Sequence, residues 1–313
     1  MKPGYRALRD SAAWLDLTGR GKIAAAGPDA RRLLHALASN HIEALTPGGG
    51  CYTFFLDAQG HILADAHILC RETDFLIDTE PETAGKLLQH LDRYIIADDV
   101  TLEDWTSRLA SIGVEGPLAE QVLAGMGAAL PQELYAHTSW DDVVVSRTDT
   151  TGSGGFLLFA PEARKPGLVH RLEEAGVPPA TPEDALAVRL ENGKPRYGPD
   201  ITGRNLPQET QAPLAVHYSK GCYLGQEIVE RVRSQGKLKR LLTRLEIDGA
   251  AIPPPGTQIA GGVITSAALS PGSGKVFALA FLPAAQAVPG ALLSFGAATV
   301  RVLEPYSPAT RFP

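Results

Sequence analysis

The segment SKGCYLGQEIV, residues 219–229, places a thiol next to a cation among glycines. Lys220 stands two residues before Cys222, Gly221 and Gly225 lie on either side of it, and a helix is predicted to begin just after. A thiol reacts as its thiolate, which a nearby ammonium group or a helix N-terminus favours. Free cysteines are also common as small buried residues. These residues alone leave Cys222 either a reactive thiol or a core residue.

Carboxylates stand at two further places where they could bind a ligand. Glu191 ends a predicted helix in VRLENGKPRYGPDI, residues 188–201. A carboxylate there can form paired hydrogen bonds with a ring edge whose N–H groups stand side by side. Asp57 and Asp65 flank the predicted turn between two strands. The alternative for all three is an ordinary solvated side chain at a helix end or turn.

A basic run follows the thiol segment in an otherwise acidic chain. Its six basic residues are Arg231, Arg233, Lys237, Lys239, Arg240 and Arg244. The run is either a solvated face or a site for a carboxylate tail, a phosphate or RNA. No aromatic residues alternate with the charges, which makes nucleic acid the weaker choice, and the net charge of −6 argues against a general nucleic-acid coat.

Several other kinds of site are not predicted. The eight histidines form no HxxxH pattern, so no metal site is expected. The three cysteines are too few and too far apart for a disulfide framework, and reduced thiols in the cytoplasm are the simplest interpretation. The N-terminal residues do not resemble a secretory signal, and no apolar run of about 18 residues predicts a membrane span.

The predicted elements indicate an α+β protein of two or three domains in 313 residues. Helical spacing predicts helices over 27–45, 82–96, 117–130, 164–176, 182–191 and 225–234. Strands are predicted over 51–57, 61–70, 74–78, 100–105 and 107–116, and as a pair within 140–161. Residues 192–214 are rich in Gly, Pro and polar residues, which predicts a long loop that is either functional or disordered. After Gly236, short strands separated by Pro and Gly predict a small β-barrel or sandwich.

KGCYLGQE, residues 220–227, resembles a specific family motif. It matches K-G-C-(aromatic)-x-G-Q-E of the YgfZ branch of aminomethyltransferase-like folate-binding proteins, which are relatives of the glycine cleavage T-protein. The resemblance extends along most of the chain, through the segments 27–37, 55–65, 147–159, 189–201 and 261–271.

The resemblance implies a three-lobed fold around tetrahydrofolate or a one-carbon derivative of it. Two lobes are then α+β and ferredoxin-like, and the third is a C-terminal small β-barrel. We expect one lobe to combine residues 1–48 with 138–236, a second to span 49–137, and the barrel to span 237–313.

The resemblance also implies roles for individual residues. Glu191 is expected to hold the pterin ring, and Asp65 to lie near the reactive part of the folate; the T-protein has an Asp-Asp pair where this chain has Ala64-Asp65. Cys222 is expected as a functional thiol near the channel mouth. The other expected folate-binding residues are Tyr197, Arg204, Lys220 and Arg231. The remaining motif residues are Gly221, Tyr223, Gly225, Gln226 and Glu227.

Two functions follow from this resemblance. The preferred hypothesis is a folate-binding accessory protein that assembles or repairs iron–sulfur clusters in other enzymes, including tRNA-modifying enzymes, with those enzymes or cluster-assembly proteins as partners. A scaffold made of cysteines alone is not expected, because one thiol cannot hold a cluster and Cys51 and Cys70 lie in predicted strands elsewhere. The alternative is a folate-dependent aminomethyl- or methyltransferase. A protein of this fold that no longer binds folate is the third possibility.

Overall fold

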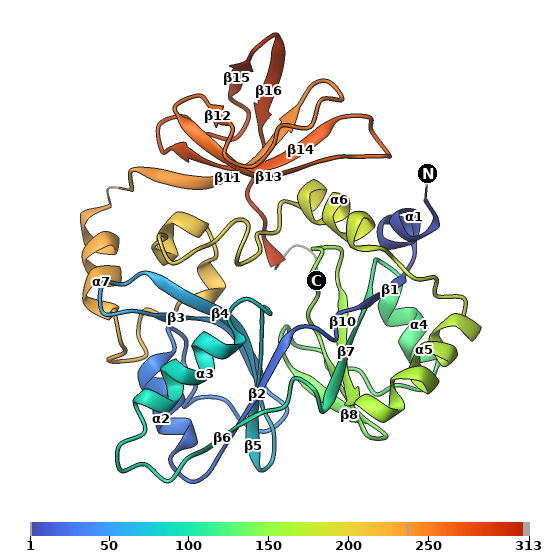
Figure 1. Ribbon diagram of the computed structural model, residues 1–313, viewed down its shortest axis with the longest axis vertical. Coiled ribbons are helices and arrows are strands. Elements are labelled where there is room, and N and C mark those ends of the chain that lie inside the picture. The colour runs from blue at the N-terminus through green and yellow to red at the C-terminus, as the bar shows by residue number, and fades with distance from the viewer. Residues whose placement is uncertain (1, 237, 309–313) are drawn as a thin grey trace.

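Three antiparallel sheets, each with its own core, form the molecule (Figure 1). The computed structural model describes residues 2–236 and 238–308. Two sheets carry helices and lie side by side, and the third forms a curled six-stranded lobe across them (Figure 1). This arrangement confirms the predicted class of two α+β lobes with a terminal barrel-like β-lobe. Within the described residues, no helix is long and apolar enough to cross a membrane.

The first lobe, as we call it, has the strand order β3-β4-β5-β2-β6. Its elements are β2 (Gly21–Ala26), α2 (Ala30–Leu37), β3 (Gly50–Leu56), β4 (Ile62–Cys70), β5 (Asp74–Thr79), α3 (Ala84–Arg93) and β6 (Thr101–Asp104). The leucines of α2 and α3 pack on one face of the sheet, where Leu34 and Leu91 are fully buried against Phe55 and Ile77. This is the helical spacing that the sequence pattern predicted.

The second lobe has the strand order β1-β7-β10-β9-β8. Its elements are α1 (Pro3–Asp10), β1 (Ala13–Asp16), β7 (Leu109–Glu115), α4 (Ala119–Gly125), β8 (His137–Trp140), β9 (Val143–Ser146), β10 (Gly155–Pro161), α5 (Lys165–Glu174) and α6 (Pro182–Asn192). A capping box between Thr181 and Asp184 begins α6, and Gly193 ends it with a positive φ of 75°. Helix α1 lies against α6 (Figure 1).

The third lobe is the six-stranded sheet β12-β13-β14-β11-β16-β15. Its strands are β11 (Arg240–Ile247), β12 (Gln258–Ile259), β13 (Gly262–Leu269), β14 (Val276–Pro283), β15 (Leu292–Phe295) and β16 (Ala298–Val302). A shared core joins it to the first lobe, because Leu242 and Phe281 of the sheet cluster with Phe54 of β3 and with Tyr223 and Val229. Val229 belongs to α7 (Gln226–Gln235), which lies beside β3 (Figure 1).

The strand pairing groups the chain differently from the lobes that we expected. We expected β2 in the same lobe as residues 138–236, whereas it pairs with β5 and β6 of the first lobe. We expected β7 in the lobe spanning 49–137, whereas it pairs with β1 and β10 of the second lobe. Nearly every residue of β7 is buried, so it needs a partner on each edge, and local pattern does not tell which strands supply them. The sequence pattern also predicted no element before residue 27, where α1, β1 and β2 lie.

Glu115 ties the end of β7 to the turn before β10. Its buried carboxylate accepts hydrogen bonds from the backbone and hydroxyl of Thr150, at 2.8 and 2.7 Å, and from the same groups of Thr151, at 2.9 and 2.5 Å. Burial and the charge of Asp149 raise the pKa of Glu115, and the threonine hydrogen bonds oppose this shift. One carboxylate therefore fixes a turn that borders the interior of the molecule.

Glu115→Gln is expected to destabilise the protein. The amide can accept at one atom only, so two buried donors lose their acceptor at a cost of about 2–5 kcal/mol in the free energy of unfolding. Urea unfolding of the variant measures this loss. Glu174→Gln, which changes an exposed glutamate of α5 paired with His170, is the control. Equal unfolding midpoints for the two variants would contradict the role assigned to Glu115.

Candidate active site

A cavity of about 700 Å³ lies where the three lobes meet. The first lobe lines it with Tyr52 and Asp65, the second lobe with residues 149–151 and part of α6, and the third lobe with Thr265. The chain after β16 turns back from the third lobe toward the middle of the molecule (Figure 1), where Tyr306 lines the same cavity. Its size and largely apolar walls are typical of a site for an organic cofactor.

Asp65 is the acidic centre of this cavity. Its side chain lies on β4 and is 8% exposed, and its Oδ2 accepts a hydrogen bond of 2.8 Å from the hydroxyl of Tyr52 on β3. The other oxygen, Oδ1, is buried and accepts no hydrogen bond from any described residue. Burial, together with the charge of Glu80, raises the pKa of Asp65 to about 7, while Tyr52 and Arg20 oppose the shift. The group can therefore hold or release a proton near neutral pH.

A buried ion network surrounds Asp65 on the same wall. Arg20 donates to Asp78 at 2.7 Å and also pairs with Glu80. Arg196, from the loop after α6, donates to Glu80 at 2.7 Å. Burial alone would raise the pKa of Asp78, but the Arg20 charge and the hydrogen bonds from His67 and Arg20 together outweigh it, and the pKa falls to about 2. Asp78 and Glu80 thus have cationic partners, whereas the only described hydrogen-bond partner of the Asp65 carboxylate is the phenol of Tyr52.

Aromatic rings cover the adjoining part of the cavity. The ring of His67 lies 5.2 Å from that of Tyr52 and 5.6 Å from that of Tyr135, measured between centroids. All three residues line the cavity. Burial raises the pKa of Tyr135 and lowers that of His67. These rings therefore present an uncharged aromatic surface beside the Asp65 carboxyl.

The turn held by Glu115 supplies the facing wall. Asp149 accepts hydrogen bonds of 2.7 Å from the backbone N–H groups of Gly152 and Gly154, and another of 2.7 Å from Lys194 Nζ. The aspartate of the segment RTDTTGSGGF thus stabilises the turn of that same segment by hydrogen bonds to its backbone. Lys194 follows Gly193, the residue that ends α6, so a helix end and a strand turn meet at this wall.

Glu191, expected to hold the pterin ring, does not line this cavity. Its carboxylate accepts a hydrogen bond of 2.5 Å from the hydroxyl of Tyr5 and pairs with Arg9 at 3.5 Å. It lines a separate pocket of about 340 Å³, and Arg244 borders both that pocket and the central cavity. The sequence did not predict this position, because the partners Tyr5 and Arg9 lie on the unpredicted helix α1.

The other expected folate-binding residues lie outside the central cavity. Tyr197 is buried in the shared core, and its hydroxyl donates to the carbonyl of Ile62 at 3.3 Å. Arg204 is exposed. Arg231 is exposed on α7, where it pairs with Glu227 at 2.6 Å. Of the residues expected at the site, only Asp65 lines the central cavity. Lys237 of the basic run lies outside the described residues.

Lys220 is buried and points into the first lobe. Its Nζ donates to the carbonyl of Ala38 at 2.7 Å and to that of His35, at the C-terminal end of α2. Burial lowers the pKa of Lys220 to about 8, and the charges of Glu43, Cys51 and Cys222 partly offset this shift. The lysine therefore fastens the motif to α2 by capping helix carbonyls, a structural role that adjacency in sequence did not indicate.

The rest of the motif forms a close-packed loop. Leu224 N donates to the carbonyl of Ala36 at 3.1 Å, and Tyr223 is buried in the shared core. Gly225 has a φ of +81°, and a Cβ there would lie 2.5 Å from the carbonyl oxygen of Asp57. A Cβ on Gly60 would lie 2.9 Å from the side chain of Ile228. The motif glycine is therefore required by direct contact with the turn that leads into β4.

Cys222 is exposed on this loop, while Cys51 and Cys70 are buried. Burial raises the pKa of the Cys51 thiol to about 12, so Cys51 is unreactive. The loop presents one thiol to solvent, and Cys222 lines neither described pocket. The structure thus separates the two residues expected to be catalytic: Asp65 lies inside the molecule and Cys222 on its surface.

Comparison with known proteins shows the family. A family model described as the GCVT N-terminal domain matches residues 2–220, which is more than half of the chain. The chain belongs to this family. An aminomethyltransferase of Rubrobacter xylanophilus is 32% identical over 295 residues, covering 90% of this chain and 79% of the relative. One from Rippkaea orientalis is 28% identical over 308 residues, covering 90% and 81%.

A solved structure shows the same fold. The crystal structure of the glycine cleavage system aminomethyltransferase T from Bartonella henselae matches with a TM-score of 0.86. The match covers 99% of this chain and 88% of that one, at 21% identity. Membership of the GCVT family and the likeness to this structure both agree with the predicted fold.

Asp65→Asn is expected to stabilise the folded protein more at high pH than at low pH. Folding raises the pKa of Asp65 from 3.8 to about 7, so the folded protein keeps a proton that the unfolded chain releases between these values. Stability of the wild type is therefore lost as the pH rises through that window, and the amide removes this loss. Urea unfolding of both proteins at about pH 4 and about pH 8 measures the difference. A stability difference that does not change with pH would contradict the raised pKa.

Proposed function

We propose that the protein binds tetrahydrofolate or a one-carbon derivative in the central cavity, and that Asp65 takes part in one-carbon chemistry there. The observation that carries this proposal is the buried Oδ1 of Asp65, which accepts no hydrogen bond from a described residue on the cavity wall. A buried carboxylate oxygen without a donor is costly unless a ligand supplies one. Membership of the GCVT family and the curated aminomethyltransferase relatives support the choice of folate.

The residues of the cavity match the parts of a reduced folate. The rings of Tyr52, His67 and Tyr135 offer aromatic faces against which an aromatic or pterin ring can pack. Reduced folate carries one-carbon units on its ring nitrogens. Next to such nitrogens, Asp65 can accept an N–H or exchange a proton, because its pKa of about 7 makes both protonation states available. The Tyr52 hydrogen bond holds the carboxyl in one orientation while it does so.

Calorimetric titration with tetrahydrofolate tests the binding site. Asp65→Asn is expected to weaken binding by roughly tenfold or more, the equivalent of one hydrogen bond to a charged group. Asp57→Asn is the matched control, because Asp57 accepts from Gln59 N and His61 N in the preceding turn and does not line the cavity. Glu191→Ala tests the family-based role for that glutamate. Unchanged affinity in Asp65→Asn, with loss in Glu191→Ala, would move the folate to the smaller pocket and overturn this proposal.

A turnover assay decides whether the bound folate is a substrate. The donors are a lipoyl-bound aminomethyl group and an N-methyl amine, and the product measured is methylene-tetrahydrofolate. For an aminomethyl- or methyltransferase, we expect the wild type to form the product. We expect Asp65→Asn to form none at a folate concentration that saturates the variant. Folate binding without turnover of either donor would contradict the transferase activity and leave folate binding intact.

The second candidate is an accessory function for iron–sulfur enzymes, which the Cys222 loop favours. Lys220, Tyr223 and Gly225 give the loop three separate attachments to the first lobe, yet the thiol itself stays exposed. A loop built to hold a surface thiol is suited to a protein partner, whereas transfer chemistry in the cavity makes no use of it. The match of KGCYLGQE to the YgfZ motif supports the same function.

Cys222→Ala is expected to lower the activity of iron–sulfur enzymes in cells that carry it as their only copy. The side chain is exposed, so its truncation is expected to leave the fold intact. Ser219→Ala, which changes an exposed neighbour in the same loop, is the control. Protein levels are matched by immunoblotting. Normal iron–sulfur enzyme activity with Cys222→Ala at the wild-type level would reject the accessory role of the thiol.

A further inference from the structure

Three potential metal ligands gather beside the Cys222 loop, in a region that the folate proposal does not use. His35, His41 and Glu43 place one ligand atom each, a ring nitrogen or a carboxylate oxygen, within 4.8 Å of one another. His35 is buried in the last turn of α2, and the other two follow in the loop before β3. The set combines two imidazoles and one carboxylate, which are ligands that zinc and similar divalent ions prefer.

The loop that carries His41 and Glu43 is fixed by its own hydrogen bonds. Asn40 Nδ2 donates to the carbonyls of Tyr52 and Leu214, each at 2.8 Å, and Asn40 Oδ1 accepts from His41 N at 2.8 Å. The backbone on which two of the three ligands sit is therefore anchored to β3 and to the segment before the motif. A set that is held in place loses little conformational entropy when an ion binds.

The ring of His35 is oriented from the motif. Its Nε2 lies 3.0 Å from the carbonyl oxygen of Lys220 and 3.6 Å from Oε2 of Glu43, and its Nδ1 accepts a long hydrogen bond of 3.3 Å from Glu43 N. An ion at Nδ1 would replace the hydrogen bond from Glu43 N and keep the Nε2–H bond to the Lys220 carbonyl, with the Glu43 carboxylate turning from Nε2 toward the ion. A metal-binding histidine usually makes such an outer hydrogen bond with its second nitrogen.

Charge and a fourth ligand are both available nearby. The Lys220 ammonium opposes a second cation at His35, and the carboxylate of Glu43 offsets it. The ring of His217 lies 5.1 Å from that of His41, and His217 N donates to the carbonyl of Ser39 at 2.9 Å. His217 begins the segment that leads to Cys222, so it can complete the coordination from the motif side.

We propose that His35, His41 and Glu43 bind one divalent transition-metal ion, with zinc as the reference case and His217 as an additional ligand. The ion would join α2, the loop after it and the segment before Cys222. The site does not depend on folate binding, because none of its residues lines the central cavity. Its consequence is that the position of the Cys222 loop is fixed by a metal as well as by Lys220.

The protein is first freed of metal with a chelator and carries no histidine tag. Its affinity for Zn²⁺ is then measured by competition against a chromophoric chelator. Co²⁺ titration gives a second readout, because a tetrahedral nitrogen and oxygen set produces intense visible absorption. The wild type is expected to bind about one equivalent, and His41→Ala and Glu43→Gln are each expected to weaken binding by at least about tenfold. Glu43 is exposed and His41 half-buried in a loop, so the variants are expected to fold, which thermal unfolding without metal verifies.

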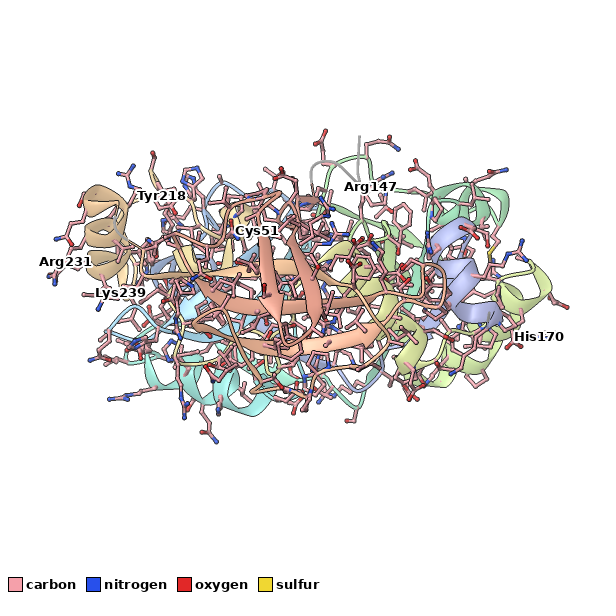
Figure 2. All side chains as sticks on the ribbon, turned by 90° about the horizontal axis from the view of Figure 1, so that it is seen from above. Cys51, Arg147, His170, Tyr218, Arg231 and Lys239 are labelled. Carbon is pink, nitrogen blue, oxygen red and sulfur yellow. The ribbon has the colours of Figure 1, made fainter. Side chains whose placement is uncertain are left out.

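His170→Ala is the matched control, because His170 and Glu174 form an exposed pair on α5 without a third ligand. His170 lies at the opposite end of the molecule from Tyr218, the residue after His217 (Figure 2). Zn²⁺ is expected to raise the unfolding temperature of the wild type and of His170→Ala, and not that of His41→Ala. Absence of stoichiometric binding in the wild type, or equal binding by His41→Ala and His170→Ala, would overturn the proposal.

Discussion

The central cavity depends on how buried carboxylates are neutralised. Asp65 and Glu80 line its wall and Asp78 is buried behind them, and taking three such charges out of water is unfavourable unless cations accompany them. Arg20 and Arg196 together serve Asp78 and Glu80. The Asp65 carboxyl has the Tyr52 hydroxyl as its hydrogen-bond partner. Burial and the repulsion of Glu80 raise its pKa. The two arginines pair with Asp78 and Glu80 and not with Asp65, and this distribution of guanidinium groups determines which carboxyl has the raised pKa. Tyr52 orients the Asp65 carboxyl by its hydrogen bond.

The sequence predicted this site in part. Asp65 could be found, because it follows a strand-turn-strand pattern whose two strands are recognisable from alternation. Its partners could not, since Tyr52, Arg20 and Arg196 come from three separate segments and meet only through the pairing of β2, β4 and β5. The direction in which a side chain points was the second feature that the sequence could not predict. Lys220 was expected to face a ligand, but it points to the carbonyls of α2, and nothing in KGCYLGQE states which way a lysine side chain runs.

The fold was more predictable than the assignment of strands to lobes. Leucine spacing identified α2 and α3, and the short strands after Gly236 identified the third lobe. Strand β7 is buried on both faces, so its pattern carries no information about whether it belongs with β6, its neighbour in sequence, or with β1 and β10. The same limit applies to Glu191, whose partners lie more than 180 residues away on α1. Long-range pairing is the information that a local pattern lacks.

The contact of Gly60 and Gly225 with their neighbours joins the inside of the molecule to its surface. Here the turn into β4 rests on the start of α7 with backbone against backbone, and the strand that leaves this turn carries Asp65. Side chains can change rotamer and absorb a displacement, whereas touching main chains pass it on. A ligand that moves β4 by a fraction of an ångström would therefore shift the loop bearing the exposed thiol. A partner protein docked at Cys222 could in this way sense whether the cavity is filled.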